Sequence, residues 1–390
     1  MNRISRRETI ALGLAAVAGA CTPMSVENAP DGLNALAAQK GLRFGSCLGT
    51  GGGAKAFEGK FAGSFDDPAV CALTVTQCGI LVPENELKWV ALRPDAQSFD
   101  FRRADILIDF AEKNGLAMRG HTLLWNRAEW FPKWVASYDF GSNPAAEAER
   151  LLREHITTVC RRYGNRVFAW DVVNETIDHD TGEMRETPFT KYLGPQAIDI
   201  AFDAARAAAP QAQLVYNDYM SWGADSAKHR AGVLRLLERL KKKKVPVDAL
   251  GVQSHIGPGA TDAGTTFSAA EQTEWRGFID EATGMGLDIV MTEFDVGDQT
   301  MPADIAARDA EVAALARGYL DLMLDYRRLR YMMAWGPTDK YSWLQGWWPR
   351  KDGLPKRPCP YDDQMRPKPL REAIADAFRA APARPAMETA

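Results

Sequence analysis

Short apolar runs rich in β-branched residues alternate with longer stretches of helical periodicity from about residue 35 to residue 380. Each run is short enough for one buried strand, and each longer stretch repeats its apolar positions every three or four residues. The predicted strands are Leu42–Cys47, Gly79–Pro83, Ala117–His121, Val167–Val173, Gln213–Tyr216, Ala249–His255, Asp288–Glu293 and Tyr331–Trp335. The predicted helices span residues 66–77, 103–114, 145–163, 195–208, 225–243, 268–285, 303–326 and 368–380. A strand followed by a helix, repeated in this way, predicts an α/β fold: a single-domain (β/α)8 TIM barrel over residues 35–382. A doubly wound open sheet is the structural alternative.

Nearly every predicted strand ends in polar or aromatic side chains, where ordinary turn residues would suffice for packing alone. These strand ends are Glu84-Asn85, His121, Asn174-Glu175, Asn217-Asp218, Gln253 with His255, Glu293, and Trp335. In a barrel, the carboxyl ends of all the strands meet on one face, which carries the functional site. The pattern therefore favours the barrel and predicts where its site lies.

Two of these strand ends carry a glutamate directly after a buried apolar run: Trp170–Glu175 and Ile289–Asp295. A carboxylic acid and a carboxylate on opposite sides of a sugar bond are the machinery of glycoside hydrolysis. His255 at the preceding strand end could donate a hydrogen bond to Glu293, and Asp295 could orient that histidine. Glu293 is therefore predicted to stay ionised and act as the nucleophile. Glu175 is predicted to be the acid/base, with Asn174 binding a sugar hydroxyl beside the reacting carbon.

Other reaction classes lack their sequence signals. The histidines His121, His155, His179, His229 and His255 include no pair at the three- or four-residue spacing of a zinc site. There is no Gly-x-Ser-x-Gly nucleophile elbow and no phosphate-binding glycine loop with its Lys-Ser/Thr. We therefore expect no metal and no cofactor. A net charge of −4 gives no electrostatic reason for a nucleic-acid partner.

Residues 1–21 have the pattern of an export signal. Three arginines, including the Arg6-Arg7 pair, precede an apolar run that is too short to span a bilayer and that ends in small residues. The arginine pair resembles the twin-arginine pattern only loosely. Cys21 follows where a lipoprotein would carry its acyl anchor, but Ala18 is not the larger aliphatic residue usual three positions earlier. We expect an exported protein, periplasmic or extracellular, with lipidation of Cys21 left open.

Five cysteines remain if Cys21 is cleaved or lipidated, so at least one thiol must be free. Cys47, Cys78 and Cys160 lie among apolar neighbours and are predicted to be buried small hydrophobes, while one disulfide stays open. At the other end of the chain, residues 383–390 are predicted to form a disordered tail.

Tryptophans crowd the segment after the last predicted strand. Flat aromatic rings stack on the C–H faces of sugar rings, and tryptophan also donates a hydrogen bond. Trp335 and Trp343 are therefore predicted to form a sugar platform. For Trp347 and Trp348, platform and packing roles both stay open. Trp134, Trp222 and Trp275 lie near predicted helices, where packing explains them.

Seven blocks in order, each at a predicted strand end, resemble glycoside hydrolase family 10, the endo-β-1,4-xylanases. The blocks are Glu84-Asn85-x-x-Lys88-Trp89, Arg119–Trp125, Trp170–Glu175, Tyr216–Tyr219, Gly251–His255, Thr292–Asp295, and Trp335-Gly336 with Asp339, Ser342 and Trp343. The resemblance covers about residues 35 to 380, and the leader and the loop 345–363 are similar to those of proteobacterial members. It implies a retaining xylanase with Glu175 as acid/base and Glu293 as nucleophile.

The resemblance also implies roles for the residues around the two glutamates. Glu84, Asn85 and Lys88 would bind the sugar one further from the cleaved bond. The sugar under attack would be lined by His121, Trp125, Asn174, Gln253 and Trp335. His255 and Asp295 would tune the nucleophile, and Trp343 would close over the chain.

Two positions depart from the family pattern: Asn126 and Ala128 stand where the family usually has histidine and glutamine. Contacts to sugars beside the attacked residue are therefore in doubt. Two alternative functions remain. One is a related retaining β-glycosidase acting on xylo-oligosaccharides or another β-1,4-glucan, and the other is a non-catalytic surface xylan-binding protein. A monomer is the default expectation.

Overall fold

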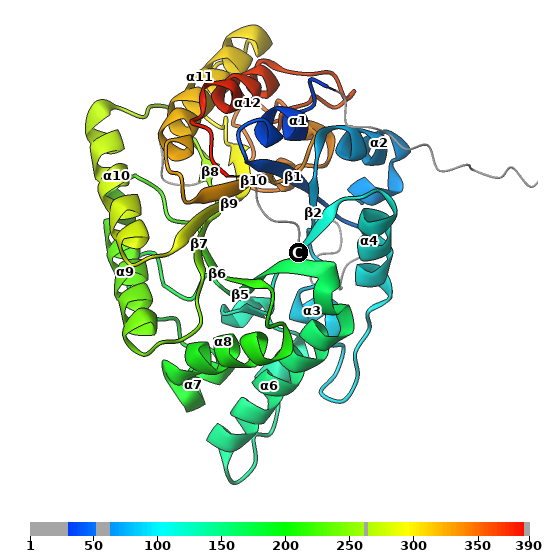
Figure 1. Ribbon diagram of the computed structural model, residues 1–390, viewed down its shortest axis with the longest axis vertical. Coiled ribbons are helices and arrows are strands. Elements are labelled where there is room, and N and C mark those ends of the chain that lie inside the picture. Colours follow the sequence, from blue (N-terminus) through cyan, green and yellow to red (C-terminus); the bar gives the residue numbers. More distant parts are fainter. Residues whose placement is uncertain (1–29, 52–62, 261–263, 386–390) are drawn as a thin grey trace, which may run out of the picture.

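Eight parallel strands close into a barrel in the computed structural model, which describes residues 30–51, 63–260 and 264–385 (Figure 1). The strands are β1 (Arg43–Leu48), β2 (Ile80–Pro83), β3 (Ala117–Gly120), β5 (Val167–Asn174), β6 (Gln213–Asp218), β7 (Ala249–Val252), β9 (Asp288–Val296) and β10 (Leu329–Ala334). Each strand pairs with the next in this order. The pairing of β1 with β10, Arg43 opposite Tyr331, closes the ring and leaves none of the eight as a free edge. The predicted (β/α)8 barrel is confirmed.

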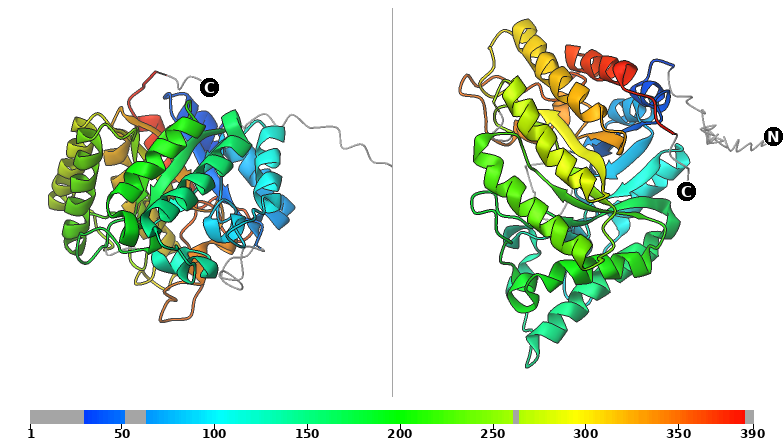
Figure 2. Two further views of the ribbon diagram at one scale, coloured as in Figure 1. Left: turned by 90° about the horizontal axis from the view of Figure 1, so that it is seen from below. Right: turned by 60° about the vertical axis from the view of Figure 1, so that its left-hand side comes forward.

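A ring of helices covers the outer surface of the barrel, as the face-on and side views show (Figures 1 and 2). They are α2 (Pro68–Gln77), α4 (Arg102–Lys113), α6 (Pro144–Tyr163), α8 (Gln196–Ala208), α9 (Ala227–Lys242), α10 (Ala269–Gly284), α11 (Ile305–Leu324) and α12 (Pro369–Ala380). All eight were predicted from periodicity. Several short elements were not: α1 (Leu33–Ala38), α3 (Trp89–Leu92), α5 (Lys133–Ala136), α7 (Pro188–Leu193), β4 (Leu124–Trp125) and β8 (His255–Ile256). Segments of two to six residues are too short to show a helical or strand period.

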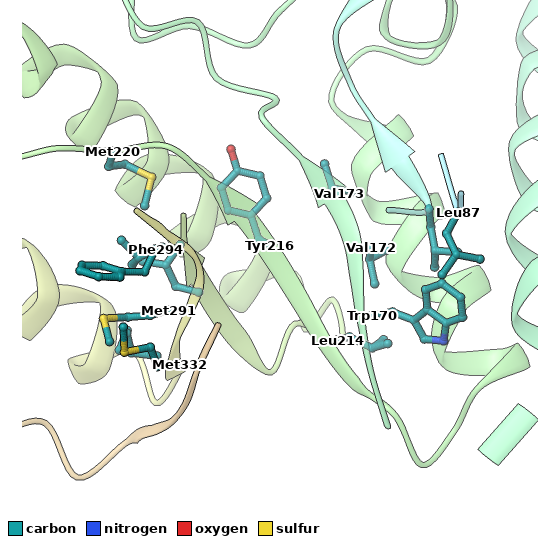
Figure 3. Close-up of a cluster of buried hydrophobic side chains, with 14 of the residues drawn as sticks. Leu87, Trp170, Val172, Val173, Leu214, Tyr216, Met220, Met291, Phe294 and Met332 are labelled. Carbon is teal, nitrogen blue, oxygen red and sulfur yellow. The ribbon is translucent and has the colours of Figure 1, made fainter. Parts of the chain in front are cut away.

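Alternation along each strand divides the core into an inner and an outer part. On β6, Leu214 and Tyr216 pack outward against the helices, whereas Val215 packs inside the barrel. Figure 3 shows part of the outer cluster, with Leu214 and Tyr216 from β6 and Met291 and Met332 from β9 and β10. The inner cluster is smaller and consists of Cys47, Ile80, Val82, Val215, Ala249, Val290, Tyr331, Met333 and Trp335.

The barrel interior is charged on the side of β3 and β5. Arg119 and Asp171 are fully buried there and form an ion pair. Tyr331 on the opposite side lies 3.4 Å from the Arg119 Nε and donates a hydrogen bond to Gln213 on β6. Because a buried charge without a partner is very unfavourable, this pairing holds both side chains in place beneath the mouth of the barrel.

The five cysteines in the described part of the chain are all free thiols, and Cys47, Cys78 and Cys160 are buried as predicted. The predicted signal at residues 1–21, with Cys21, lies outside the described residues. In the part of the chain that the structure describes, no helix combines the length and apolar character needed to cross a membrane.

The prediction of a disordered tail from residue 383 is wrong for its first residues. Arg384 is buried, and its guanidinium donates to the carbonyl oxygens of Leu324 and Leu329 at 2.7 and 2.5 Å. Its backbone N–H also donates to Lys40, which ties the chain end to the segment before β1. Composition pointed to disorder because it could not show that one arginine would bind carbonyl groups at the end of α11 and at the start of β10.

Arg384→Ala is expected to lower the free energy of unfolding by about 1–3 kcal/mol, because the substitution removes a charged donor and leaves several carbonyl acceptors without a partner. Chemical denaturation would measure the change. Arg379→Ala, which removes an exposed arginine on α12 paired with Asp376, is the matched control and should change stability by less than about 0.5 kcal/mol. Equal losses in the two variants would contradict the anchoring role of Arg384.

Candidate active site

Every second side chain of a barrel strand points inward, and at the mouth of the barrel the inward side chains are polar instead of apolar. On β2 the inward positions Ile80 and Val82 are followed by Glu84 just beyond the strand. The same two-residue step leads from Arg119 to His121 and from Val215 to Asn217. Glu84 and His121 line a cavity of about 550 Å³, and Asn217 lies behind it against Glu293.

Two inward side chains in succession require a break in this alternation. Glu175 supplies it, because it adopts a left-handed backbone conformation with φ of 54°. Asn174 and Glu175 therefore both line the cavity. Ser254 is also left-handed, with φ of 63°, and lies between Gln253 and His255, which line the cavity from the same side. Non-glycine residues rarely adopt this conformation, and it clusters at functional sites.

Gly251 makes room for a further polar group. A Cβ at this inward position would lie 2.4 Å from the side-chain oxygen of Asn217, which is closer than real Cβ contacts. With the space free, the Asn217 oxygen accepts a hydrogen bond from Thr292 at 2.6 Å. Its amide nitrogen then donates to Glu293 at 2.8 Å. The Thr292 contact therefore determines which end of the Asn217 amide faces the carboxylate.

Glu293 is a buried carboxylate held by donors and positive charges. His255 Nε2 lies 3.3 Å and His121 Nδ1 3.9 Å from its oxygens. Burial by itself would raise the pKa of Glu293, but His121, His255 and Lys88 oppose it and lower the pKa to about 2. Glu293 is thus ionised across the working pH range of ordinary proteins, as a nucleophilic carboxylate must be.

Carboxylates behind the two histidines fix their orientation. His255 Nδ1 lies 2.9 Å from Asp295, which also accepts a hydrogen bond from Trp343 Nε1 at 2.7 Å. Burial would lower the pKa of His255, but Asp295 and Glu293 raise it to about 10. His121 Nδ1 lies 2.8 Å from Asp171. The Arg119–Asp171 pair beneath the mouth therefore positions the second histidine.

Glu175 has different surroundings. Its Oε1 accepts a hydrogen bond from Gln253 at 2.9 Å and lies 3.3 Å from the Asn174 amide. Its Oε2 forms an ion pair with Arg127 at 3.0 Å. Asn174 also lies within hydrogen-bond distance of Asn217, so a continuous polar network joins the two glutamates across the cavity floor.

A third acidic group closes one end of the cavity. Glu84, Asn85 and Lys88 line it together, and Lys88 donates to Asn85 at 2.9 Å while its cation lies 4.5 Å from the centre of the Trp125 ring. Burial and the neighbouring Glu86 raise the pKa of Glu84, whereas burial lowers the pKa of Lys88. This corner therefore offers a hydroxyl-rich ligand both donors and acceptors.

Aromatic side chains form the walls. Trp125 stacks on Trp130 with ring centres 4.8 Å apart, and both line the cavity. Trp335 and Trp343 contact the ring of His255 on another wall. Trp347 and Trp348 also line the cavity, and Trp348 is 46% exposed. Trp222 and Trp275 are buried in the core and Trp134 is partly buried against it, in agreement with the packing role predicted from the sequence.

All the predicted site residues except Asp295 line this one cavity, and Asp295 lies directly behind His255. Sequence reasoning assigned no role to Asn217, Asp171 or Arg127. Asn217 and Asp171 do lie in blocks that pointed to the family, so their place in the strands was a usable signal. Arg127 lies beyond the end of β4, where no strand pattern indicates its direction.

Of the described residues, one set could offer a metal three ligand atoms: His121, Asp171 and Glu293, whose candidate atoms lie within 4.8 Å of one another. Arg119 and His121 already engage the two oxygens of Asp171. His121, His255 and Lys88 all act on Glu293 and lower its pKa. Ion pairs and hydrogen bonds explain this cluster fully.

A comparison with known families decides the assignment. Residues 32–377 match the family described as Glycosyl hydrolase family 10. This chain belongs to that family. It is therefore a glycoside hydrolase, and the barrel with two strand-end glutamates is its catalytic domain.

Individual members of family 10 agree with this assignment. Endo-1,4-beta-xylanase 5 of Pyricularia oryzae is 30% identical over 358 residues, which cover 90% of this chain and 80% of that protein. Native xylanase 10B from Thermotoga maritima superposes with a TM-score of 0.76 at 28% identity, over 89% of this chain and 98% of the other. Xylanase 10B from Thermotoga petrophila, solved in complex with xylobiose, gives 0.75 at 28% identity, over 89% and 97%.

Proposed function

We propose that this protein is a retaining endo-1,4-β-xylanase that hydrolyses internal bonds of xylan by double displacement. One observation carries the proposal: two glutamates in different electrostatic surroundings line one tryptophan-walled cavity. Glu293 is held as a carboxylate by His255, His121 and Asn217, while Glu175 faces Gln253 and Arg127. The relatives that are named xylanases supply the substrate class.

In the first half-reaction, the Glu293 carboxylate attacks the anomeric carbon while Glu175 protonates the departing glycosidic oxygen. The C–O bond to the leaving sugar breaks as the ester bond to Glu293 forms. In the second half-reaction, Glu175 takes a proton from water, whose oxygen attacks the same carbon and releases Glu293. Two inversions give net retention at that carbon.

The remaining side chains bind and orient the sugars. We assign the sugar one further from the cleaved bond to Glu84, Asn85 and Lys88. The residues that line the attacked sugar are His121, Trp125, Asn174, Gln253 and Trp335. Asp295 keeps His255 aimed at Glu293 and holds the indole of Trp343 over the site. Stacking on flat rings favours pyranose chains, and the mixed donors and acceptors select hydroxyl groups.

A substrate screen tests the proposal. The enzyme is expected to release reducing sugar from xylan and much less from cellulose or mannan, with xylo-oligosaccharides as products. NMR of the first-formed product should show the β-anomer, because retention keeps the configuration of the bond that is cleaved. Preferential cleavage of cellulose or mannan would support the related β-glycosidase instead. Xylan binding without any cleavage would support the non-catalytic alternative.

Export is part of the proposal because xylan is a polymer that lies outside the cell. The arginine-rich leader and the short apolar run at residues 1–21 support it. Lipidation of Cys21 would retain the enzyme at a membrane surface. Mass spectrometry of the N-terminal peptide from the native host would distinguish an acylated Cys21 from a freely secreted chain.

A further inference from the structure

Trp348 presents an exposed aromatic surface at the rim of the cavity. Its side chain is 46% exposed, and of the large apolar side chains that are exposed in the described part of the chain, only Trp348 also lines the cavity. Exposed apolar surface that borders a binding site is typical of contact with a ligand. The indole therefore offers a ligand in the cavity a flat surface on which to stack.

The backbone beside Trp348 is held in one conformation. Trp348 is left-handed, with φ of 45°, which is unfavourable for a bulky side chain. The side-chain amide of Gln299 donates to the carbonyl oxygens of Trp348 at 3.2 Å and of Pro349 at 3.4 Å. The buried Lys356 donates to the carbonyl oxygen of Trp347 at 2.6 Å. Hydrogen bonds at three successive residues thus support a strained backbone, as is common at functional sites.

A buried arginine anchors the next residue of the same segment. Arg350 donates to the carbonyl oxygen of Met301 at 2.9 Å and also to that of Asp298, and it forms an ion pair with Asp352 at 2.6 Å. Residues 347–350 are therefore bound to the chain that follows β9. Because this backbone is already ordered, a ligand that stacks on Trp348 loses little affinity to the ordering of the loop.

The indole of Trp348 continues the tryptophan wall of the catalytic site. Its ring centre lies 5.7 Å from that of Trp343, and Trp343 contacts the ring of His255. His255 in turn lies beside the nucleophile Glu293. The aromatic surface therefore extends without a break from the catalytic centre to the rim.

The two departures from the family pattern make this surface more important. Asn126 is fully buried, and its side chain donates to Thr176 at 2.5 Å and accepts from Thr187 at 2.9 Å. Ala128 is exposed and does not line the cavity. Neither position brings a side chain to the neighbouring sugars, so binding beyond the attacked sugar depends on the other walls.

Trp348 lies across the mouth of the barrel from the Glu84 corner. Gln299, which binds the Trp348 backbone, follows β9, and its own backbone N–H donates to Pro258 just after β8. β7 leads into β8 and is four strands from β2 in the ring of eight, on its opposite side. Glu84 follows β2 and is assigned to a sugar on the attacked side of the bond. A chain that crosses the mouth therefore reaches Trp348 on the leaving-group side.

Resting on the proposed function, we propose that Trp348 is a stacking platform for a xylose unit on the leaving-group side, beyond the sugar that carries the cleaved oxygen. An indole face binds the C–H face of a pyranose ring, and xylan presents such faces along its chain. The platform adds binding energy only for chains long enough to reach it. The enzyme should therefore prefer long xylan segments to short xylo-oligosaccharides.

Trp348→Ala tests the inference on two substrates of different length. On xylohexaose, kcat/KM is expected to fall by about tenfold, the size expected for the loss of an aromatic stacking contact. An activated aryl xylobioside fills the attacked site and the Glu84 corner and has only its aryl group on the leaving-group side. Its kcat/KM should change by less than about twofold. Trp348→Phe keeps a flat ring and should recover most of the activity on xylohexaose.

The products of xylopentaose labelled at its reducing end test on which side the platform lies. The labelled fragment is the leaving group, so its length reports how many sugars are bound on that side. Trp348→Ala should give shorter labelled fragments than the wild type, because the variant holds fewer sugars there. Longer labelled fragments, or an unchanged product pattern, would overturn the inference.

Leu354→Ala is the matched control, because Leu354 is an exposed apolar residue of the same loop that does not line the cavity. It should leave both substrates at wild-type values. Gln299→Ala removes the support of the Trp348 backbone and should lower activity on xylohexaose in the same direction. Equal losses on both substrates in Trp348→Ala, with a lower melting temperature, would show a structural role and overturn the inference. A wild-type enzyme that does not cleave xylan would overturn the proposed function instead.

Discussion

Glu293→Ala is expected to lower kcat on xylan by at least about 10⁴-fold, because it removes the atom that forms the covalent intermediate. Binding of a xylo-oligosaccharide should change much less, since Trp335, Trp343 and the Glu84 corner remain in place. Turnover assays and calorimetric titration of the ligand measure the two effects separately. Glu238→Gln, at an exposed position on α9, is the control for loss of a carboxylate and should retain full activity.

The same variant has a second consequence at His255. In the wild-type protein two carboxylates, Asp295 and Glu293, raise the pKa of His255 to about 10. Removing Glu293 leaves Asp295 alone against the cost of burial, so the imidazole should titrate at lower pH in the variant. NMR titration of the histidine side chains would show the change. Full turnover in Glu293→Ala would contradict the assignment of Glu293 as the nucleophile. An unaltered His255 titration would contradict the proposed electrostatic coupling between Glu293 and His255.

The barrel was predictable because its elements are long and repeat regularly. A largely apolar run such as Val167–Val173 is typical of a strand that is buried on both faces in an α/β fold, and the helices between the strands show clear periodicity. The eight predicted strands and helices all appear, with ends shifted by a few residues. Polar strand ends then located the site, since a closed barrel brings all of them to one face.

What the sequence did not show depends on local geometry. Strand alternation would turn Glu175 away from Asn174, and only the left-handed conformation at Glu175 brings both into the cavity. Asn217 faces Glu293 because Gly251 leaves space for it and Thr292 orients its amide. Arg127 and Arg384 bind partners brought near only by folding. No spacing rule connects such pairs.

Glu175→Ala is expected to separate substrates by their leaving groups. Xylo-oligosaccharides need a proton on the departing oxygen, so their kcat/KM should fall by about 10²–10⁴-fold, the usual contribution of a general acid. The phenolate of an activated aryl xylobioside can leave without that proton, so the first step on this substrate should proceed at nearly the wild-type rate. The second step still needs a base, so the glycosyl-enzyme on Glu293 should accumulate. Stopped-flow measurement would show a burst of released phenol followed by slow turnover.

Glu175→Gln tests the role of the Glu175 proton while it keeps nearly the shape of the side chain. The amide keeps nearly the size of the carboxyl group and can still interact with Gln253, but it can neither donate the catalytic proton nor accept one from water. It should therefore reproduce the leaving-group dependence of the alanine variant with less loss of binding. If both variants slowed the first step equally for activated and unactivated substrates, Glu175 would be a binding residue. The acid would then have to be another group on the cavity wall, and Glu84 is the candidate there, because burial and Glu86 already raise its pKa.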